Sequence, residues 1–498
     1  MGRFLLGMLT GIGLLLALAG FAALVLWQQL PKVSSVSAGD RATSDAVGLY
    51  TPERIAAGRA RLALEDPRII QRFLTGGTFG GKSSRVAALH MFSRDPSVTA
   101  DIREKTERIE VGPGSWLVRF PIVNAAFFET DDGVVVVDTG MAAAGPVLLE
   151  HIRAVTDAPI SAIVVTHGHV DHLSGLWAFE AAGEWPDLVI GHERIAARMD
   201  RYADLNGSIA KYMSQPLEEV PAARGDIVLP TTLFDDSGMV FQRAGEGFLI
   251  VPHRGETDDQ AYVWLPERKV LVTADYYQGF LPNLGNGKRI QRYGSEWIAA
   301  LREMADLGAE IMLPMHGEPI VGADAIRESL TLVADALQHI EDETRAGLNA
   351  GLRKDEVVDA ITWPRRFADD PRLATYYVTP QDIAKMYISQ WTGWWDDQPA
   401  HWSPATLEAQ SELIVQMAGG IDAVVRRGQG LLETDLVLAS HLADWAFYAA
   451  PENPEVRRLA IEVYRRRLLD PAVSEQEALA YYDHAALIRA LELEGPAR

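Results

Sequence analysis

The pattern of apolar and polar residues divides the chain into four stretches. Phe4 to Trp27 is apolar and carries no charge, and residues 33–85 mix Ser, Gly and Arg around one amphipathic stretch, Pro52 to Ala63. From about residue 86 to 325, short β-rich runs alternate with helical stretches, and beyond that helical periodicity dominates. We predict a transmembrane anchor (1–32), a linker or lead-in (33–85), an α/β domain (86–325) and an all-helical domain (326–498).

The β-rich runs predict strands bounded by Gly and Asp. We expect them at Trp116–Phe120, Ala125–Glu129, Val134–Asp138, Ala162–Thr166, Phe248–Val251, Ala261–Leu265, Lys269–Thr273 and Ile311–Leu313. Helices are expected at Ala142–Val155, Ile298–Asp306, Ile326–Ala346, Pro380–Gln390, Thr406–Ala418 and Asn453–Leu468.

The N-terminal apolar stretch is long enough to cross a bilayer, which takes about 20 residues. A cleaved signal peptide is the alternative, and Val36-Ser37-Ala38 offers a cleavage site, but the apolar core of such peptides is shorter, roughly 7 to 15 residues. Arg3 and Lys32 flank the stretch and orient it weakly. We favour an anchor with the catalytic body in the periplasm or otherwise outside the cytoplasm.

Charge and cysteine content exclude several functions. The net charge is −22, from 68 acidic and 46 basic residues, so a nucleic acid is not an expected partner. A small anionic substrate stays open, because local cations in a cleft can override the global sign. With no cysteine, neither disulfides nor thiolate metal ligands are possible, and any metal must bind His, Asp or Glu.

The strongest chemical signal is His167-Gly168-His169-Val170-Asp171-His172, which follows the apolar strand ending near Thr166. Four potential metal ligands lie within six residues. Chain that leaves a strand can direct alternate side chains inward, so His167 and His169 can share one ion while Asp171 and His172 face a second. The alternative without a metal is a surface loop with titrating histidines, and the spacing of the four residues argues against it.

Further candidate ligands follow or precede other apolar runs: Glu256, Asp275 and His316. Each has an ordinary alternative, as a solvated loop acid, a turn residue and a packed loop histidine respectively. Their order along the chain and their positions at strand ends favour one shared dinuclear site.

These residues resemble the metallo-β-lactamase superfamily, over about residues 86 to 325. The resemblance implies an αββα sandwich with two divalent metal ions held by the seven side chains His167, His169, Asp171, His172, Glu256, Asp275 and His316. Asp171 and Asp275 are then catalytic, Asp275 bridges the ions, and Asp138 supports the metal loops. Zinc is the expected metal, with manganese and iron open, because carboxylate-rich sites accept several ions.

One position departs from the commonest superfamily pattern, since Gly255-Glu256-Thr257 stands where a histidine is usual. His253 is the rival ligand, but it would require the loop to shift. The alkyl sulfatases use glutamate here, and the helical half is similar to their dimerisation domain at Gly393–Pro399, Met417–Gly420 and Ala449–Pro454. The resemblance therefore implies the alkyl sulfatase branch and a homodimer.

The segment Pro282 to Arg289 supplies candidates for substrate binding, because alkyl sulfatases hold sulfate with residues at this place. Asn283 and Arg289 are expected to bind the oxyanions, with Lys288 as a substitute; a guanidinium matches such oxygens bidentately. An exposed turn with solvated charges is an equally good interpretation of this segment.

The sequence therefore predicts a dinuclear metal-dependent hydrolase that cleaves sulfate esters with a metal-bound hydroxide. A second hypothesis keeps the site and changes the substrate to a lactone, phosphodiester or β-lactam, because the fold alone does not fix the chemistry. A third is a non-catalytic membrane-attached scaffold with a structural metal. The ligand set leaves room for solvent on both ions, which favours catalysis.

Overall fold

The computed structural model describes residues 48–75, 88–290 and 292–494, and their strands form two sheets. The first sheet has the order β1-β2-β3-β4-β5-β6-β7, with β1 Glu107–Gly112, β2 Ser115–Arg119, β3 Asn124–Thr130, β4 Gly133–Val137, β5 Ile160–Val164, β6 Leu188–His192 and β7 Thr232–Phe234. The second has the order β13-β12-β11-β10-β9-β8, with β8 Met239–Arg243, β9 Glu246–Pro252, β10 Ala261–Leu265, β11 Val270–Val272, β12 Ile311–Leu313 and β13 Ile320–Val321.

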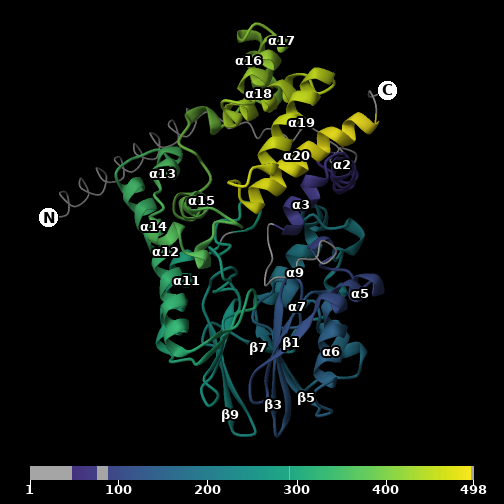
Figure 1. The fold of residues 1–498 in the computed structure, drawn as a ribbon, viewed down its shortest axis with the longest axis vertical. Helices are drawn as coiled ribbons and strands as arrows, with labels where there is room; N and C mark the ends of the chain where they lie inside the picture. Colours follow the sequence, from purple (N-terminus) through teal and green to yellow (C-terminus); the bar gives the residue numbers. More distant parts are fainter. Residues whose placement is uncertain (1–47, 76–87, 291, 495–498) are drawn as a thin grey trace, which may run out of the picture. The chain divides into compact units, whose positions relative to one another are not determined.

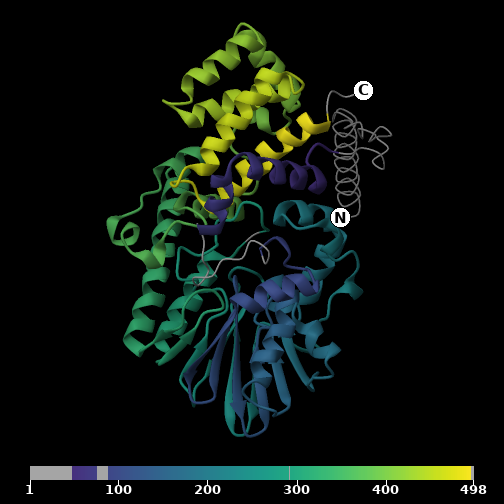
Figure 2. The same cartoon turned by 45° about the vertical axis from the view of Figure 1, so that its right-hand side comes forward.

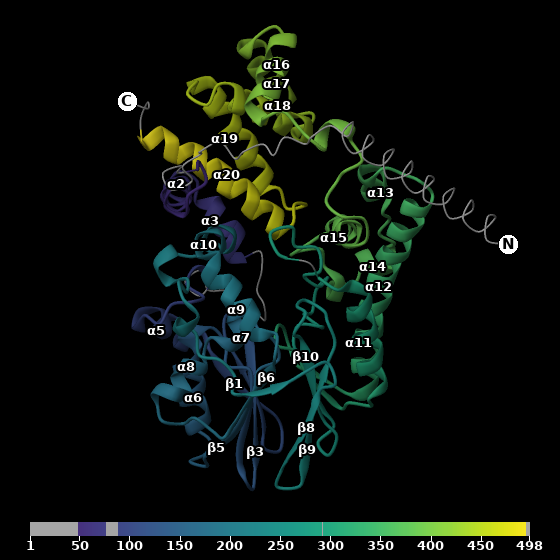
Figure 3. The same cartoon turned by 180° about the vertical axis from the view of Figure 1, so that it is seen from behind.

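The two sheets pack face to face and helices cover both outer faces (Figure 1). Apolar side chains such as Phe128 and Val137 from the first sheet meet Phe248 and Val263 from the second in one buried cluster. The outer face of the first sheet carries α5 (Pro96–Lys105), α6 (Gly145–Arg153), α8 (Leu176–Ala181), α9 (Ile195–Asp204) and α10 (Asn206–Met213). The second carries α11 (Gly294–Asp306) and α12 (Ala323–Asn349), as the rear view in Figure 3 shows. The predicted αββα sandwich is confirmed.

Strand position explains why β4 was predicted and why two of the other strands were missed. β4 reads Gly-Val-Val-Val-Val and is buried along its whole length, as a continuous apolar run predicts for a strand covered on both faces. By contrast, β1 and β8 are edge strands with partly exposed, polar sequences, and the sequence analysis missed both. Whether a segment forms an edge strand depends more on its pairing with the neighbouring strand than on its own apolar content.

The helices of the domain expected at 326–498 contribute to two separate cores. Helices α12 and α15 (Pro380–Thr392), with the segment carrying α13 (Lys354–Ala360) and α14 (Arg365–Ala368), share a core with the second sheet. The apolar stripe of α12 covers the outer face of that sheet, so this helix completes the sandwich. A distinct core begins only with α16 (Leu407–Met417), α17 (Ile421–Leu431), α18 (Leu436–Ala449), α19 (Pro454–Leu469) and α20 (Glu475–Glu494).

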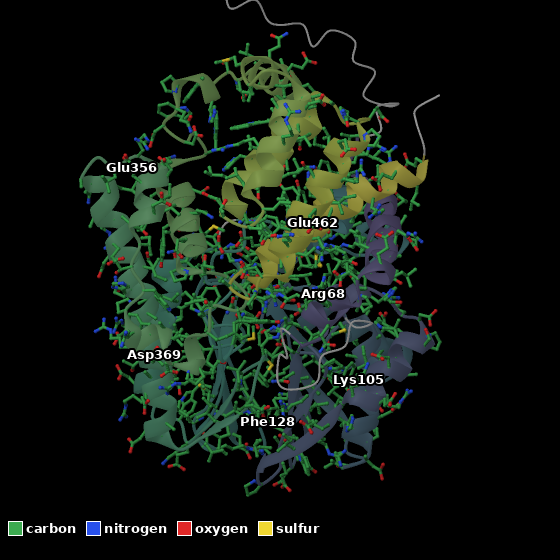
Figure 4. The ribbon with its side chains drawn as sticks, turned by 45° about the horizontal axis from the view of Figure 1, so that its top comes forward. Arg68, Lys105, Phe128, Glu356, Asp369 and Glu462 are labelled. Carbon is green, nitrogen blue, oxygen red and sulfur yellow. The ribbon has the colours of Figure 1, made fainter. Side chains whose placement is uncertain are left out.

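The segment interpreted as a linker contains two packed helices in its described part. α2 (Pro52–Glu65) lies along α20 and α3 (Pro67–Thr75) continues from it, as Figures 1 and 2 show. The close contact between α2 and α20 requires a glycine at position 58, because a Cβ there would lie 1.8 Å from the carbonyl oxygen of Ala486. Arg68 on α3 and Glu462 on α19 are labelled in Figure 4, where these helices meet. Part of residues 33–85 therefore belongs to the helical core.

The predicted transmembrane anchor at residues 1–32 lies outside the described residues. Among the helices that the structure does describe, none combines the length and the apolar character needed to cross a bilayer.

Candidate metal centre and active-site cavity

The ends of four strands bring the predicted ligands to one edge of the sandwich. β4 and β5 are parallel neighbours in the first sheet, and β11 and β12 are parallel neighbours in the second. Parallel strands present their carboxyl ends at the same edge. Asp138 follows β4, the His167 motif follows β5, Asp275 follows β11 and His316 follows β12. Sheet topology thus explains why residues up to about 180 positions apart in sequence converge.

All seven predicted ligand side chains lie in one cluster. It contains three overlapping groups whose ligand atoms lie within 4.8 Å of one another: His167, His172 and Asp275; Asp171, His172 and His316; and His169, Glu256 and Asp275. The second group contains Asp171 and His172, which the sequence analysis assigned to one ion, and the third contains His169; His167 is in the first group, with its Nε2 3.0 Å from His169 Nδ1. Asp275 occurs in the first and third groups, and its carboxylate also lies 3.3 Å from His172 Nε2 and from His316 Nε2 of the second group.

Asp275 is the centre of the cluster. Its Oδ1 lies 3.3 Å from His172 Nε2, and its Oδ2 lies 3.3 Å from His316 Nε2 and 3.7 Å from His167 Nε2. Ala274, the residue before it, has φ +47°, a left-handed conformation that costs free energy in any residue with a Cβ. The fold holds this backbone strain directly beside the cluster.

Hydrogen bonds around the cluster fix the orientation of the histidine rings. His172 Nδ1 lies 2.8 Å from Asp138 Oδ2, and His316 Nδ1 lies 2.8 Å from the carbonyl oxygen of Ile122. Asp138 also accepts hydrogen bonds from the amide and hydroxyl groups of Thr166, at 2.7 and 2.8 Å. Each ring therefore directs Nε2 into the cluster, which is the arrangement that a metal-binding histidine needs.

Burial keeps two of the rings in the neutral form that can bind a metal. It lowers the pKa of His167 and of His169 well below the usual histidine value, and neighbouring positive charges act in the same direction. Neutral imidazole is the form that ligates metals, so neither ring has to lose a proton at neutral pH.

The structure brings Glu256 rather than His253 into the cluster. Glu256 is buried, and its Oε1 lies 4.0 Å from His169 Nδ1. His253 instead lies at the surface beside Glu303, with 2.9 Å between Nε2 and Oε2, and its ring stacks on Tyr262. The register read from the sequence thus places the glutamate, and not the histidine, beside His169.

Three side chains hold the carboxylate of Glu256. Asn283 Nδ2 donates to Oε1 at 2.6 Å, Gln278 Nε2 donates to Oε2 at 3.0 Å, and the guanidinium of Arg292 forms an ion pair with Oε1. Arg292 also donates to the carbonyl oxygen of Glu256 at 2.9 Å. Neither Arg292 nor Gln278 was singled out from the sequence. Asn283, predicted to bind substrate, donates its amide to a candidate metal ligand instead.

A cavity of about 180 Å³ opens onto the cluster. Asn283, Arg289 and Arg292 line it. Two of these, Asn283 and Arg289, are among the three residues predicted to bind substrate. Lys288 does not line it: Nζ lies 3.2 Å from Asp483 Oδ2 on α20, which also pairs with Arg59. Lys288 was expected to take the place of Arg289 in binding the substrate oxyanions. That expectation is wrong for this structure, because this lysine joins the loop to the helical core.

The donor set fits divalent cations. His172 Nε2 and Asp275 Oδ1 are buried and have no hydrogen-bond partner in the described part of the chain. Leaving such groups unpaired is costly, and both face the centre of the cluster. Four imidazoles and three carboxylates are ligands that zinc and similar ions accept.

Comparison with known proteins agrees with this geometry. Residues 118–316 match the model of the metallo-β-lactamase superfamily, and residues 353–490 match the alkyl sulfatase dimerisation family. The chain is therefore a metallo-β-lactamase-fold protein of the metal-dependent hydrolase class. Its second matched region adds an alkyl sulfatase dimerisation domain.

Curated relatives match about three quarters of the chain at low identity. A linear primary-alkylsulfatase of a Pseudomonas species is 28% identical over 74% of this chain, which spans 73% of that protein. An alkyl/aryl-sulfatase of Saccharomyces cerevisiae is 22% identical over 75% of this chain, which spans only 61% of that protein. Among solved structures, a stereoselective inverting sec-alkylsulfatase from Pseudomonas sp. matches with a TM-score of 0.64 and 19% identity, covering 91% of this chain and 79% of the other; this similarity concerns the fold.

Proposed function

We propose that this protein hydrolyses sulfate esters with an alkyl substituent. One observation carries the proposal: a cluster suited to divalent metals and two arginines share one cavity. A sulfate ester needs both, because its negative charge must be compensated and its ester bond must meet a nucleophile. The alkylsulfatase relatives support the same substrate class.

The proposed cofactor is a pair of divalent ions, with zinc as the expected metal. We assign one ion to His169 and Glu256 together with His167, whose Nε2 lies 3.0 Å from His169 Nδ1, and the other to Asp171, His172 and His316, with Asp275 in reach of both sets. When bound, such ions supply an activated water at neutral pH and polarise the ester oxygens. Asp171 and Asp275 are the carboxylates that we assign to this centre as catalytic.

The remaining side chains position the substrate and the centre. Arg292 is buried, and burial lowers its pKa to about 9, so its guanidinium stays charged at neutral pH. Arg289 adds a second positive charge to the same cavity. Both charges face a site in which three carboxylates offset much of the metal charge, so an anionic ester depends on them.

The apolar part of the cavity lining suits an alkyl group. Met91, Ile122 and Leu479 line the cavity together with the polar residues. Apolar walls with a few directed polar groups are typical of small-molecule sites. The cation end and the apolar walls thus match the two halves of an alkyl sulfate.

The test is release of inorganic sulfate from a panel of alkyl sulfates by the purified, metal-loaded full chain. We expect turnover that His169→Ala abolishes and that His441→Ala, which changes an exposed histidine on α18, leaves intact. Lactones, phosphodiesters and β-lactams belong in the same panel, and turnover of only those substrates would contradict the proposal. Unfolding on metal removal, without hydrolysis of any ester, would instead favour a structural metal.

We further propose that the protein is a homodimer. Trp394, Trp402 and Met417 expose 73%, 63% and 81% of their surface and lie in the region matched by the alkyl sulfatase dimerisation family. Exposed apolar groups of this size mark interaction surfaces. We expect a dimer mass by light scattering that Trp394→Ser with Met417→Ser reduces, while Leu493→Ser, a control with 59% exposure on α20, does not. A wild-type monomer would contradict this.

Membrane attachment through residues 1–32, with the body outside the cytoplasm, is the proposed localisation. The charge-free run from Phe4 to Trp27 supports it. Cell fractionation with protease treatment of spheroplasts tests it: we expect the protein in the membrane fraction and cleaved by external protease. Recovery in the soluble cytoplasmic fraction would contradict the proposal.

A further inference from the structure

The helical core supplies one wall of the active-site cavity. Glu475, Gln476 and Leu479, all at the beginning of α20, line the cavity together with the candidate metal ligands. Arg289 and Arg292 line the same cavity. A carboxyl group and two guanidinium groups, from regions of the chain far apart in sequence, therefore face one small space.

The backbone around Glu475 is fixed by hydrogen bonds. Its amide donates to the carbonyl oxygen of Tyr376 at 2.8 Å, and the amide of Gln476 donates to that of Tyr377 at 3.4 Å. The side chain is half-buried, and Oε2 has no hydrogen-bond partner in the described part of the chain. Such a carboxyl group is held in place without a neutralising partner on that oxygen.

Burial is the largest influence on this carboxyl group. It raises the pKa of Glu475 to about 7, although the hydroxyl of Tyr376 and the positive charge of Arg72 on α3 favour the ionised form. Glu477, the next acid on α20, points to Arg467 at 2.9 Å instead. Tyr377 also lines the cavity, and its hydroxyl is within electrostatic reach of four charged groups: Arg289, Glu475, Arg292 and Asp171.

We propose that the charge on Glu475 sets how tightly the cavity holds an anionic ligand, so that the neutral carboxyl permits binding and the carboxylate opposes it. The inference rests on the proposed anionic substrate. A carboxylate in the lining partly cancels the field of the two arginines in the same cavity, and a confined, poorly solvated cavity screens this effect less than bulk water does. Glu475 would then be a specificity-determining residue contributed by the helical core.

A linear alkanesulfonate is the probe, because it carries the charge and chain of a sulfate ester and lacks the ester bond. Its dissociation constant is measured by calorimetry on the metal-loaded full chain, from about pH 5.5 to about pH 8, which spans the pKa of Glu475 and stays below that of Arg292. Other groups that titrate in this range act on the wild type and on Glu475→Gln alike. The ratio of the two dissociation constants therefore isolates Glu475.

The ratio of the wild-type dissociation constant to that of Glu475→Gln should be near one at the acid end of the range. At the alkaline end it should be on the order of ten, because the wild type then binds the sulfonate more weakly. Glu477→Gln, the matched control, should follow the wild type. A ratio that stays constant with pH would overturn the proposal. So would a Glu475→Gln variant that binds normally and loses turnover at saturating substrate, since that result describes a proton donor.

The binding measurement separates this inference from the proposed function. If no sulfate ester is hydrolysed but sulfonate binding shows the expected ratio, the proposed activity fails and the role of Glu475 stands. If sulfate esters are hydrolysed and the ratio is flat, the activity stands and the role of Glu475 fails.

Discussion

The guanidinium of Arg292 contacts both the main-chain carbonyl oxygen and the side-chain carboxylate of Glu256. Nη1 lies 2.9 Å from the carbonyl oxygen of Glu256 and also forms an ion pair with the carboxylate. Both side chains are buried, so neither charge is compensated by water. The arginine therefore holds in place the one candidate ligand that departs from the commonest superfamily pattern.

Replacing Arg292 by Gln should weaken metal binding and lower stability. The buried carboxylate loses its ion-pair partner, and breaking a buried pair typically costs about 3 to 5 kcal/mol of folding free energy. Loss of a group that orients a ligand typically reduces metal affinity about 10- to 100-fold. Metal content after dialysis, measured by atomic emission, and thermal unfolding check both effects.

Arg289→Gln is the matched control for that change. Arg289 lines the same cavity and forms no ion pair with Glu256 in the described structure. We expect this variant to keep its metal and to raise KM for an alkyl sulfate. Equal metal loss in the two variants would contradict the separate roles assigned to these arginines.

Asp138→Asn should also weaken metal binding, through His172. Asp138 accepts hydrogen bonds from the Thr166 amide and hydroxyl while it contacts His172 Nδ1. An asparagine has one acceptor oxygen, so its NH₂ group would face one of these donors. We expect a metal affinity reduced about 10- to 100-fold, measured by competition with a chelator. Asp187→Asn, an exposed change, should bind metal normally, and an unchanged affinity for Asp138→Asn would contradict the orienting role.

The metal ligands could be predicted from the sequence because their placement depends on local features. The His167 motif directly follows β5, and Asp275 and His316 each follow a short apolar strand. The carboxyl ends of parallel strands lie at the same edge of the sheet, whatever conformation the following loops adopt. Glu256 followed from its register relative to β10, without any information about its contacts.

The surroundings of the ligands could not be predicted in the same way. Lys288, Arg289 and Arg292 lie within five positions, and the path of one loop decides which of them faces the cavity. Lys288 is drawn to Asp483, which is 195 residues further along the chain. Nothing in the local pattern marks that partner, nor that α12 would cover the second sheet, since an amphipathic helix does not specify what its apolar face contacts.

Gly58→Ala should destabilise the protein through the contact of α2 with α20. A Cβ at this position would lie 1.8 Å from the backbone oxygen of Ala486, so the helices must separate. Forcing extra volume into a packed contact typically costs about 1 to 3 kcal/mol. Gly430→Ala on α17, where nothing lies within 4 Å of the new Cβ, is the control and should be neutral or slightly stabilising. Chemical denaturation measures both, and an unaffected Gly58→Ala would mean that α2 does not pack there in solution.

Glu475→Gln should stabilise the protein at alkaline pH and have little effect at acid pH. A free glutamate ionises near pH 4.3, whereas burial raises the pKa of Glu475 in the folded protein to about 7. Between these values the unfolded chain binds fewer protons than the folded one, so wild-type stability falls as the pH rises from about 4 to about 7, and stays lower above it. Glutamine has no such titration. The melting temperature of Glu475→Gln minus that of the wild type should therefore be larger at pH 8, about one unit above the pKa, than at pH 5, about two units below it. Glu477→Gln should show no such increase, and an equal difference at both pH values would mean that Glu475 titrates as an ordinary solvated acid.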